Sequence, residues 1–196
     1  MTNYRKDIKK ILSENNGLVT AEQISNYGIP RRCLSEMTGA GSIVKVGRGI
    51  YALPEVWEDE MFILQYRFSR GIYSHETALY LHGMTDRTPY RYTMTFPHGY
   101  NTSNAKKQNI VAKTVLPKLY ELGITDTISP TGHILKVYDI ERTLCDIIKN
   151  KSDIQVINPA MKVYATFKHK DISKLIGYAE QLRVKSKVLA YMEVLL

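Results

Sequence analysis

The sequence predicts an α+β protein built from two domains. Apolar residues recur every three or four positions over 4–14, the spacing of an amphipathic helix. Two β-type runs, 43–46 and 50–53, flank a glycine-rich turn, the pattern of a hairpin. Further on, the alternation in "YRYTMTF" predicts a strand, and several helical patterns follow position 139. We therefore expect a small N-terminal domain, followed by a larger α+β domain with a mostly antiparallel sheet and several helices.

The first domain begins with three predicted helices. The first covers 4–14. The second has Thr20 as its N-cap with Gln23 three residues later, the pattern of a capping box. Gly28 ends this helix, because glycine readily takes the left-handed conformation that closes a helix. Pro30 opens the third helix, since the N–H that proline lacks is unsatisfied in a first turn anyway.

Residues 1–53 contain one helix, then two short helices joined at a glycine, and then a hairpin. This is the order of elements in a winged helix-turn-helix. Arg31 and Arg32 stand at the start of the third helix, where the helix dipole disfavours cations. In a helix-turn-helix this is where side chains meet base edges, and arginine bridges guanine O6 and N7. Arg48, at the glycine-flanked hairpin tip, is placed to reach a minor groove or a phosphate.

The sequence thus predicts binding to double-stranded DNA. Two simpler alternatives stay open: arginines that are merely solvated, or a winged domain that serves as a protein-binding adaptor. Lys6, Lys9 and Lys10 are weaker candidates for phosphate contacts. The predicted DNA-contacting residues are Arg31, Arg32, Ser35, Glu36, Lys45, Arg48, Lys106 and Lys107.

The larger domain is expected at 59–196, after a linker at 54–58 whose Trp57 packs the two parts together. Ser74 is a predicted N-cap, with Thr77 at the third helical position. Further strands are predicted near 109–116, 118–122, 125–129 and 133–138, and helices at 59–70, 139–150, 158–167, 171–182 and 185–195.

The chain carries a formal charge of +8, which favours a polyanionic partner. No acid occurs between Asp86 and Glu121, although six lysines and arginines do. This basic run is either a solvated surface or an extension of the DNA-contacting surface, and both readings stay open. No apolar stretch is long enough for a membrane span, and the first ten residues lack the apolar segment of a signal peptide. We expect a cytoplasmic protein whose Cys33 and Cys145 stay reduced.

Two groups of residues deserve a test as chemical sites. His75 and His82 are seven residues apart, which is too far along a helix for one metal ion. Asp139, Glu141 and Asp146 could serve a metal-dependent nuclease. However, Asp139 is explained as a helix cap, and Asp146 as an i, i+4 partner of Arg142. We therefore predict no enzyme, no metal site and no cofactor, and keep the nuclease as an alternative.

Three segments resemble one known family in order and spacing. "RGIYAL", "SHETALYLHGM" and "VYDIERTLCDII" are similar to the end of the wing, the S-H-x-(S/T)-A-x-x-L-H-G-(L/M) helix and the E-(R/K)-T-L-x-D helix of AbiEi proteins. AbiEi proteins are the antitoxins of type IV, abortive-infection toxin–antitoxin systems, which act in phage defence. The resemblance implies a repressor that binds inverted repeats in its own promoter. It also implies that the second domain counters a nucleotidyltransferase-like toxin without forming a stable complex with it.

Overall fold

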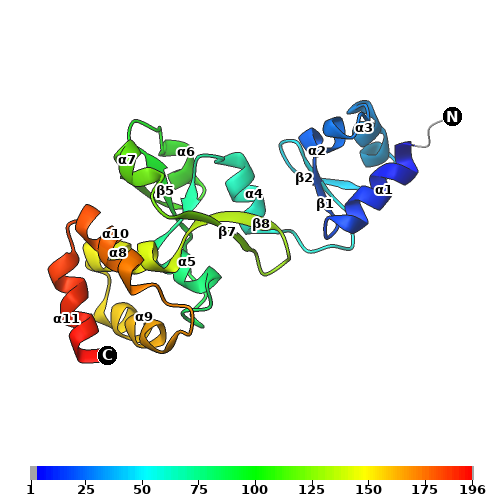
Figure 1. Ribbon diagram of the computed structural model, residues 1–196. Coiled ribbons are helices and arrows are strands. Elements are labelled where there is room, and N and C mark those ends of the chain that lie inside the picture. Colours follow the sequence, from blue (N-terminus) through cyan, green and yellow to red (C-terminus); the bar gives the residue numbers. More distant parts are fainter. Residues whose placement is uncertain (1–3, 196) are drawn as a thin grey trace. The chain divides into compact units, whose positions relative to one another are not determined.

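The computed structural model describes residues 4–195, which form two compact units (Figure 1). The first unit contains the chain up to Arg67 together with the segment 128–134, and the second contains the rest. The first unit therefore extends beyond the predicted winged domain of residues 1–53 and takes in the helix that follows the predicted linker.

Both units combine helices with a sheet, so the predicted α+β class is confirmed. The first unit contains α1 (Tyr4–Glu14), β1 (Leu18–Thr20), α2 (Ala21–Asn26), α3 (Arg32–Gly39), β2 (Val44–Gly47), β3 (Ile50–Ala52) and α4 (Glu60–Arg67). There follow β4 (Ile72–Tyr73), α5 (His75–Leu81), β5 (Thr93–Pro97), α6 (Ser103–Lys107), β6 (Val111–Val115), α7 (Pro117–Tyr120), β7 (Ile124–Ile128), β8 (Ile134–Tyr138), α8 (Ile140–Lys149), α9 (Ile154–Thr166), α10 (Ile172–Gln181) and α11 (Lys185–Leu195).

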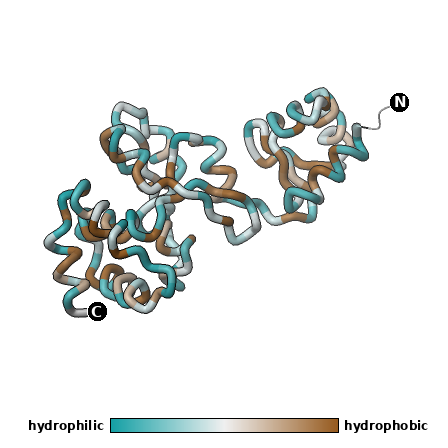
Figure 2. The backbone as a smooth tube through the Cα atoms, viewed as in Figure 1, coloured by the Kyte–Doolittle hydropathy of each residue, from teal (hydrophilic) through white to brown (hydrophobic). Residues whose placement is uncertain are grey.

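The helices of the first unit enclose one apolar core. Ile8, Ile11 and Leu12 lie on the inward face of α1, as their spacing predicts, and pack with Ile24 of α2 and Leu34 of α3. Figure 2 shows these hydrophobic stretches alternating with hydrophilic ones along the chain. The order α1-β1-α2-α3-β2-β3 is that of a winged helix-turn-helix, so this predicted fold is confirmed.

The predicted capping box is present at the start of α2. The Gln23 N–H donates to Thr20 Oγ1 at 3.1 Å, and the Thr20 N–H donates to Gln23 Oε1 at 2.8 Å. Gly28 has a φ of +72°, which confirms its predicted left-handed conformation after the helix. These two residues fix where α2 begins and ends.

The third helix starts later than the sequence predicts. Arg31 is its N-cap and Arg32 its first helical residue, so the placement of Pro30 at the first helical position was wrong. The Cys33 N–H donates to the Pro30 carbonyl at 3.0 Å, which shows that Pro30 opens the turn leading into the helix. The two arginines still stand at the helix N-terminus.

A three-stranded sheet in the order β1-β3-β2 completes the winged fold. The predicted hairpin of β2 and β3 is confirmed, with a tight turn at Arg48 and Gly49. Gly49 has a φ of +74°, a backbone conformation that is strained for residues other than glycine. The pairing of β1 with β3 was missed, because three residues are too few for a recognisable period.

Trp57 of the predicted linker has a side chain that is 88% exposed, and its role in packing the two parts together stays a prediction. In this segment Val56 is the residue that packs. A Cβ placed on Gly17 would lie 2.4 Å from Val56 Cγ2, and Gly17 has a φ of +78°. The segment is therefore held against the turn after α1 by a contact that only glycine permits.

A buried polar cluster centred on Asp59 holds the loop between β7 and β8 within the first unit. Asp59 is 3% exposed. Its Oδ1 accepts the Phe62 N–H at 2.9 Å, which caps α4. Its Oδ2 accepts hydrogen bonds from Ser129 Oγ at 2.5 Å, from His133 Nδ1 at 2.7 Å and from the Thr131 hydroxyl. Burial alone would raise the pKa of Asp59, but the bonds from His133, Ser129, Thr131 and Phe62 outweigh it and lower the pKa to about 2.

The sheet of the second unit is mixed, with the strand order β6-β5-β4-β8-β7. β4 pairs antiparallel with β5, whereas β4 with β8 and β5 with β6 are parallel. The parallel pair of β5 and β6 is joined by a crossover that contains α6, whereas β4 and β8 are far apart in the sequence. The sequence shows strands but not their partners, which is why a mostly antiparallel sheet was expected.

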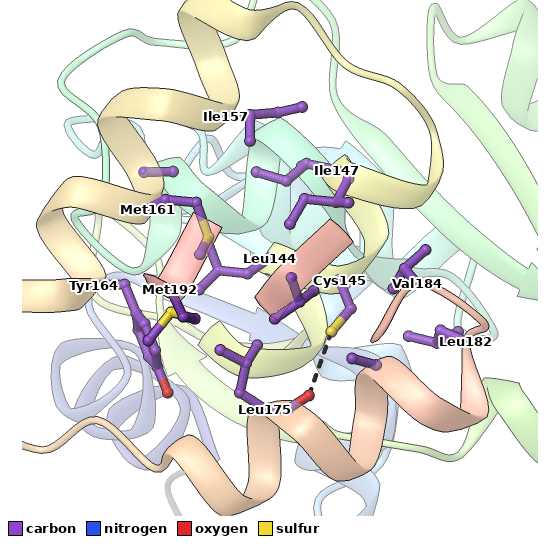
Figure 3. Close-up of a cluster of buried hydrophobic side chains, with 14 of the residues drawn as sticks. Leu144, Cys145, Ile147, Ile157, Met161, Tyr164, Leu175, Leu182, Val184 and Met192 are labelled. Atoms are coloured by element: carbon purple, nitrogen blue, oxygen red, sulfur yellow. Dashed lines mark hydrogen bonds between the residues drawn. The ribbon is translucent and has the colours of Figure 1, made fainter. Parts of the chain in front are cut away.

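Helices α8 to α11 and α5 pack into the larger core of the second unit. Leu144, Cys145 and Ile147 of α8 point toward Met161 of α9 and Leu175 of α10 (Figure 3). Cys145 Sγ lies 3.7 Å from the Leu175 carbonyl, and burial raises the pKa of its thiol to about 12. Both Cys33 and Cys145 are free and buried.

Two local expectations fail in this unit. The segment 118–122 is not a strand, because Pro117 begins the short helix α7 there. Ser74 occupies the N-cap position of α5, but its hydroxyl makes no capping bond and accepts one from Thr95 Oγ1 at 2.8 Å. The other predicted strands and helices are confirmed within a few residues of their bounds.

Candidate nucleic-acid interface

The helix α3 has two distinct faces. Cys33, Leu34 and Met37 are buried in the core of the first unit. The opposite face is exposed, and its residues are three or four positions apart, the spacings that share one side of a helix. This face carries Arg31, Arg32, Ser35 and Glu36.

The Arg31 side chain is oriented by α2. Its Nε donates to Ser25 Oγ at 2.8 Å, and the Ser25 hydroxyl donates to the Ala21 carbonyl at 2.9 Å. The four N–H bonds at the end of the guanidinium remain to donate elsewhere. At the other end of the same face, Glu36 pairs with Arg5 at 3.8 Å, an exposed contact of little energetic value.

Arg31 lines a groove of about 640 Å³ in the first unit, together with Arg48 of the hairpin turn and Arg67 of α4. Tyr66 and Glu22 also line it, and Glu22 is the one acid among the lining residues. A guanidinium is charged at all physiological pH values, and its planar fork matches a phosphate group. The groove therefore carries a net positive charge from side chains suited to binding a phosphodiester backbone.

Arg67 and Tyr66 belong to this groove, although no pattern in the sequence indicates it. The predicted helix at 59–70 was assigned to the second domain, whereas α4 packs beside the hairpin. A Cβ placed on Gly47 would lie 3.6 Å from Ile63 Cγ2, and one on Gly49 would lie 3.7 Å from the Tyr66 hydroxyl. The pattern of α4 indicates a helix, but it does not identify the surface against which the helix packs.

The remaining predicted DNA-contacting residues lie outside the groove lining. Lys45 is exposed on β2, and the lysines of α1 are exposed on its outer face. Lys106 and Lys107 are exposed on α6 in the second unit. Contacts between these lysines and DNA remain predictions.

The carboxylates of the alternative nuclease site are engaged with protein groups. Asp139 caps α8, and its Oδ2 lies 3.0 Å from Lys174 Nζ. Glu141 accepts a hydrogen bond from the Tyr164 hydroxyl at 3.1 Å and lies 3.5 Å from Lys174 Nζ. These contacts bind α8 to α9 and α10.

Arg142 and Asp146 form a buried ion pair inside the second unit. Arg142 is 0% exposed, and its Nε donates to Asp146 Oδ2 at 3.0 Å. One terminal nitrogen donates to the carbonyls of Leu119 (2.5 Å) and Leu122 (2.9 Å), and the Tyr138 ring lies 4.2 Å from Cζ. The predicted i, i+4 pair is confirmed.

The two histidines of the sequence motif have separate environments. His82 Nε2 lies 2.7 Å from the Tyr138 carbonyl, a contact that ties α5 to the end of β8. His75 Nδ1 lies 3.0 Å from Ser74 Oγ. Over residues 4–195, no group of three histidine, cysteine or acidic side chains is arranged to hold a metal ion.

The fold and the basic groove define a winged-helix protein with a surface of the kind that transcriptional regulators carry. Residues 6–54 match the family described as transcriptional regulator, AbiEi antitoxin. The resemblance noted in the sequence is thereby confirmed over the winged domain.

One solved structure extends the similarity of fold to nearly the whole chain. It is that of the RV2827C protein from Mycobacterium tuberculosis, with a TM-score of 0.58 and 14% sequence identity. The alignment covers 97% of this chain and 78% of that chain. No curated protein sequence matches the chain. None of the helices in the described part of the chain has the length and apolar character needed to cross a bilayer.

Proposed function

We propose that this protein represses transcription by binding inverted repeats in its own promoter, and that it acts as the antitoxin of a type IV system in the cytoplasm. The observation that carries the DNA-binding part is the groove shared by Arg31, Arg48 and Arg67. It brings the start of α3 and the turn of the wing to one surface, although they are far apart in the sequence.

In this proposal the exposed face of α3 enters the major groove. Arg31 and Arg32 bind base edges, and one such bidentate contact contributes about 1–3 kcal/mol of discrimination. This exceeds the few tenths of a kcal/mol by which a helix dipole disfavours a cation. Arg48 and Arg67 then contact phosphates, which set the register of the protein on the duplex without reading sequence.

The test is binding of the purified full chain to the duplex upstream of its own gene and to a scrambled duplex, at about 50 and 200 mM salt. We expect selective binding that weakens steeply with salt. Arg31→Ala should lose selectivity, whereas Lys162→Ala, an exposed lysine on α9, should retain it. Equal and weak binding to both duplexes would overturn the proposal and favour a protein-binding adaptor.

The antitoxin part of the proposal rests on the family match of residues 6–54 and on the two sequence motifs in the second unit. The partner we propose is a nucleotidyltransferase-like toxin encoded next to this gene. The carboxylates of α8 favour a regulator over a nuclease, because each is engaged with protein groups.

This part is tested by expressing the neighbouring toxin with and without the full chain. We expect restored growth on co-expression, with no complex on size-exclusion chromatography. Growth arrest that persists at matched expression would contradict the antitoxin role and leave the repressor role intact. Co-elution of the two proteins would contradict the type IV mechanism.

A further inference from the structure

The second unit contains a polar pocket that the proposed function does not use. It has a volume of about 300 Å³ and is lined by His75, Arg91, Lys113, Asn150 and Tyr90, among others. These residues come from α5, from the loop before β5, from β6 and from the end of α8. The tertiary structure alone brings them together.

The pocket contains more hydrogen-bond donors from cationic side chains than acidic groups to accept from them. Lys113 Nζ donates to Asn150 Oδ1 at 2.9 Å, and Arg91 Nε donates to the Asn109 carbonyl at 3.2 Å. Each contact orients a cation and leaves it further N–H bonds to donate. Glu76 is the one acid among the lining residues, so the pocket has a net positive charge.

His75 adds a neutral donor to this set. Thr95 Oγ1 donates to Ser74 Oγ, so the Ser74 hydroxyl hydrogen is available to His75 Nδ1, which lies 3.0 Å away. We assign the ring hydrogen to Nε2, which has no hydrogen-bond partner within the described chain. Burial, aided by the charges of Lys113 and Arg142, lowers the pKa of His75 to about 3, so the ring stays neutral. His75 also has a φ of +56°, a strained conformation of the kind that collects at binding sites.

A second hollow of about 560 Å³ adjoins the pocket and shares Tyr90 with it. On the α9 side its wall is mostly apolar and includes Val156, Pro159 and Val163, with Gln155 as its polar member. Tyr90 is 94% exposed, so its ring is open to contact with a flat ligand. A cationic pocket therefore lies next to an exposed aromatic ring and an apolar wall.

We propose that the second unit binds a nucleoside phosphate, with the phosphate in the pocket of His75, Arg91 and Lys113 and the base on Tyr90. Cations that outnumber the one acid, together with further N–H donors, favour an anion, and phosphate accepts several such bonds at once. A base stacks on an exposed aromatic ring whatever its identity. Both volumes fall in the range of small-molecule sites. The proposal does not depend on DNA binding by the first unit.

The test is calorimetric titration of the full chain with guanosine monophosphate, guanosine and inorganic phosphate at low salt. We expect the nucleotide to bind more tightly than phosphate, and guanosine to bind least. Lys113→Met keeps most of the apolar stem but removes the charge, and should weaken nucleotide binding about tenfold. His75→Asn should also weaken it, because asparagine tolerates a positive φ but does not reproduce Nε2–H.

Tyr90→Ala separates the two halves of the ligand. It should weaken the nucleotide about tenfold and leave inorganic phosphate unchanged. Lys187→Met, an exposed lysine on α11 outside both hollows, is the matched control and should bind the nucleotide like the unchanged protein. Three results would overturn the proposal. Neither Lys113→Met nor Tyr90→Ala affects nucleotide binding, guanosine binds as tightly as guanosine monophosphate, or no probe binds at all. Promoter binding measured on the same variants reports separately on the repressor.

Discussion

Asp146→Ala should strongly destabilise the second unit rather than remove a catalytic group. Arg142 has lost all contact with solvent, and one of its terminal nitrogens already lacks a hydrogen-bond partner in the described chain. The substitution would leave a buried guanidinium with no counter-charge, which costs about 3–5 kcal/mol. Natural domains have a total unfolding free energy of about 5–15 kcal/mol, so the loss is a large part of the whole.

The assay is urea unfolding at pH 8, followed by circular dichroism. Burial raises the pKa of Asp146 to about 6 in spite of Arg142, so the carboxylate of the unchanged protein is ionised at that pH. The free energy of unfolding falls by about 2–3 kcal/mol per molar urea. The urea midpoint of Asp146→Ala should therefore be lower by about 1–2 M. Asp126→Ala is the matched control, because Asp126 forms an exposed pair with Lys136 at 2.7 Å. Asp126→Ala should lower the free energy of unfolding by at most about 1 kcal/mol.

The double variant Arg142→Met with Asp146→Leu tests the physical reasoning further. Apolar side chains of similar size often replace a buried ion pair without loss, so most of the stability should return. An unchanged midpoint for Asp146→Ala would refute the structural role. If Asp146→Ala also lost a Mg²⁺-dependent nuclease activity, the nuclease alternative would replace the structural role of Asp146.

Three further predictions concern the first unit. Arg67→Gln should weaken promoter binding and lower the salt slope by about one, as measured by anisotropy titration, whereas Arg70→Gln, three residues later and outside the groove, should do neither. Because the pKa of Asp59 is lowered from 3.8 to about 2, its ionised form stabilises the fold by about 2 kcal/mol above pH 4. That contribution should disappear as the pH falls through about 2, and urea midpoints of Asp59→Asn should lack this pH dependence. Gly17→Ala should cost about 1–3 kcal/mol in thermal unfolding, since its Cβ meets Val56 at a positive φ; a melting temperature within a degree of the original would contradict this.

The local elements of the winged domain could be predicted from the sequence because their signals lie within a few residues of one another. The capping box of Thr20 and Gln23, the left-handed Gly28 and the glycine-flanked turn at Arg48 all formed where their residue types require. Burial also followed the helical period, as on α1 and α3. Short-range hydrogen bonds and backbone sterics decide these features.

Tertiary packing alone decided which elements meet. Nothing in the order of residues places Arg67 beside Arg31 and Arg48, or brings His75 to Lys113, because these approaches depend on how helices pack against sheets. The parallel pairing of β4 with β8 likewise joins strands about 60 residues apart. Residue types and their spacing alone predict a winged fold with two arginines at the start of its third helix. The tertiary structure decided the extent of the basic groove and created the pocket around His75, since side chains distant in the chain become neighbours only when the cores have formed.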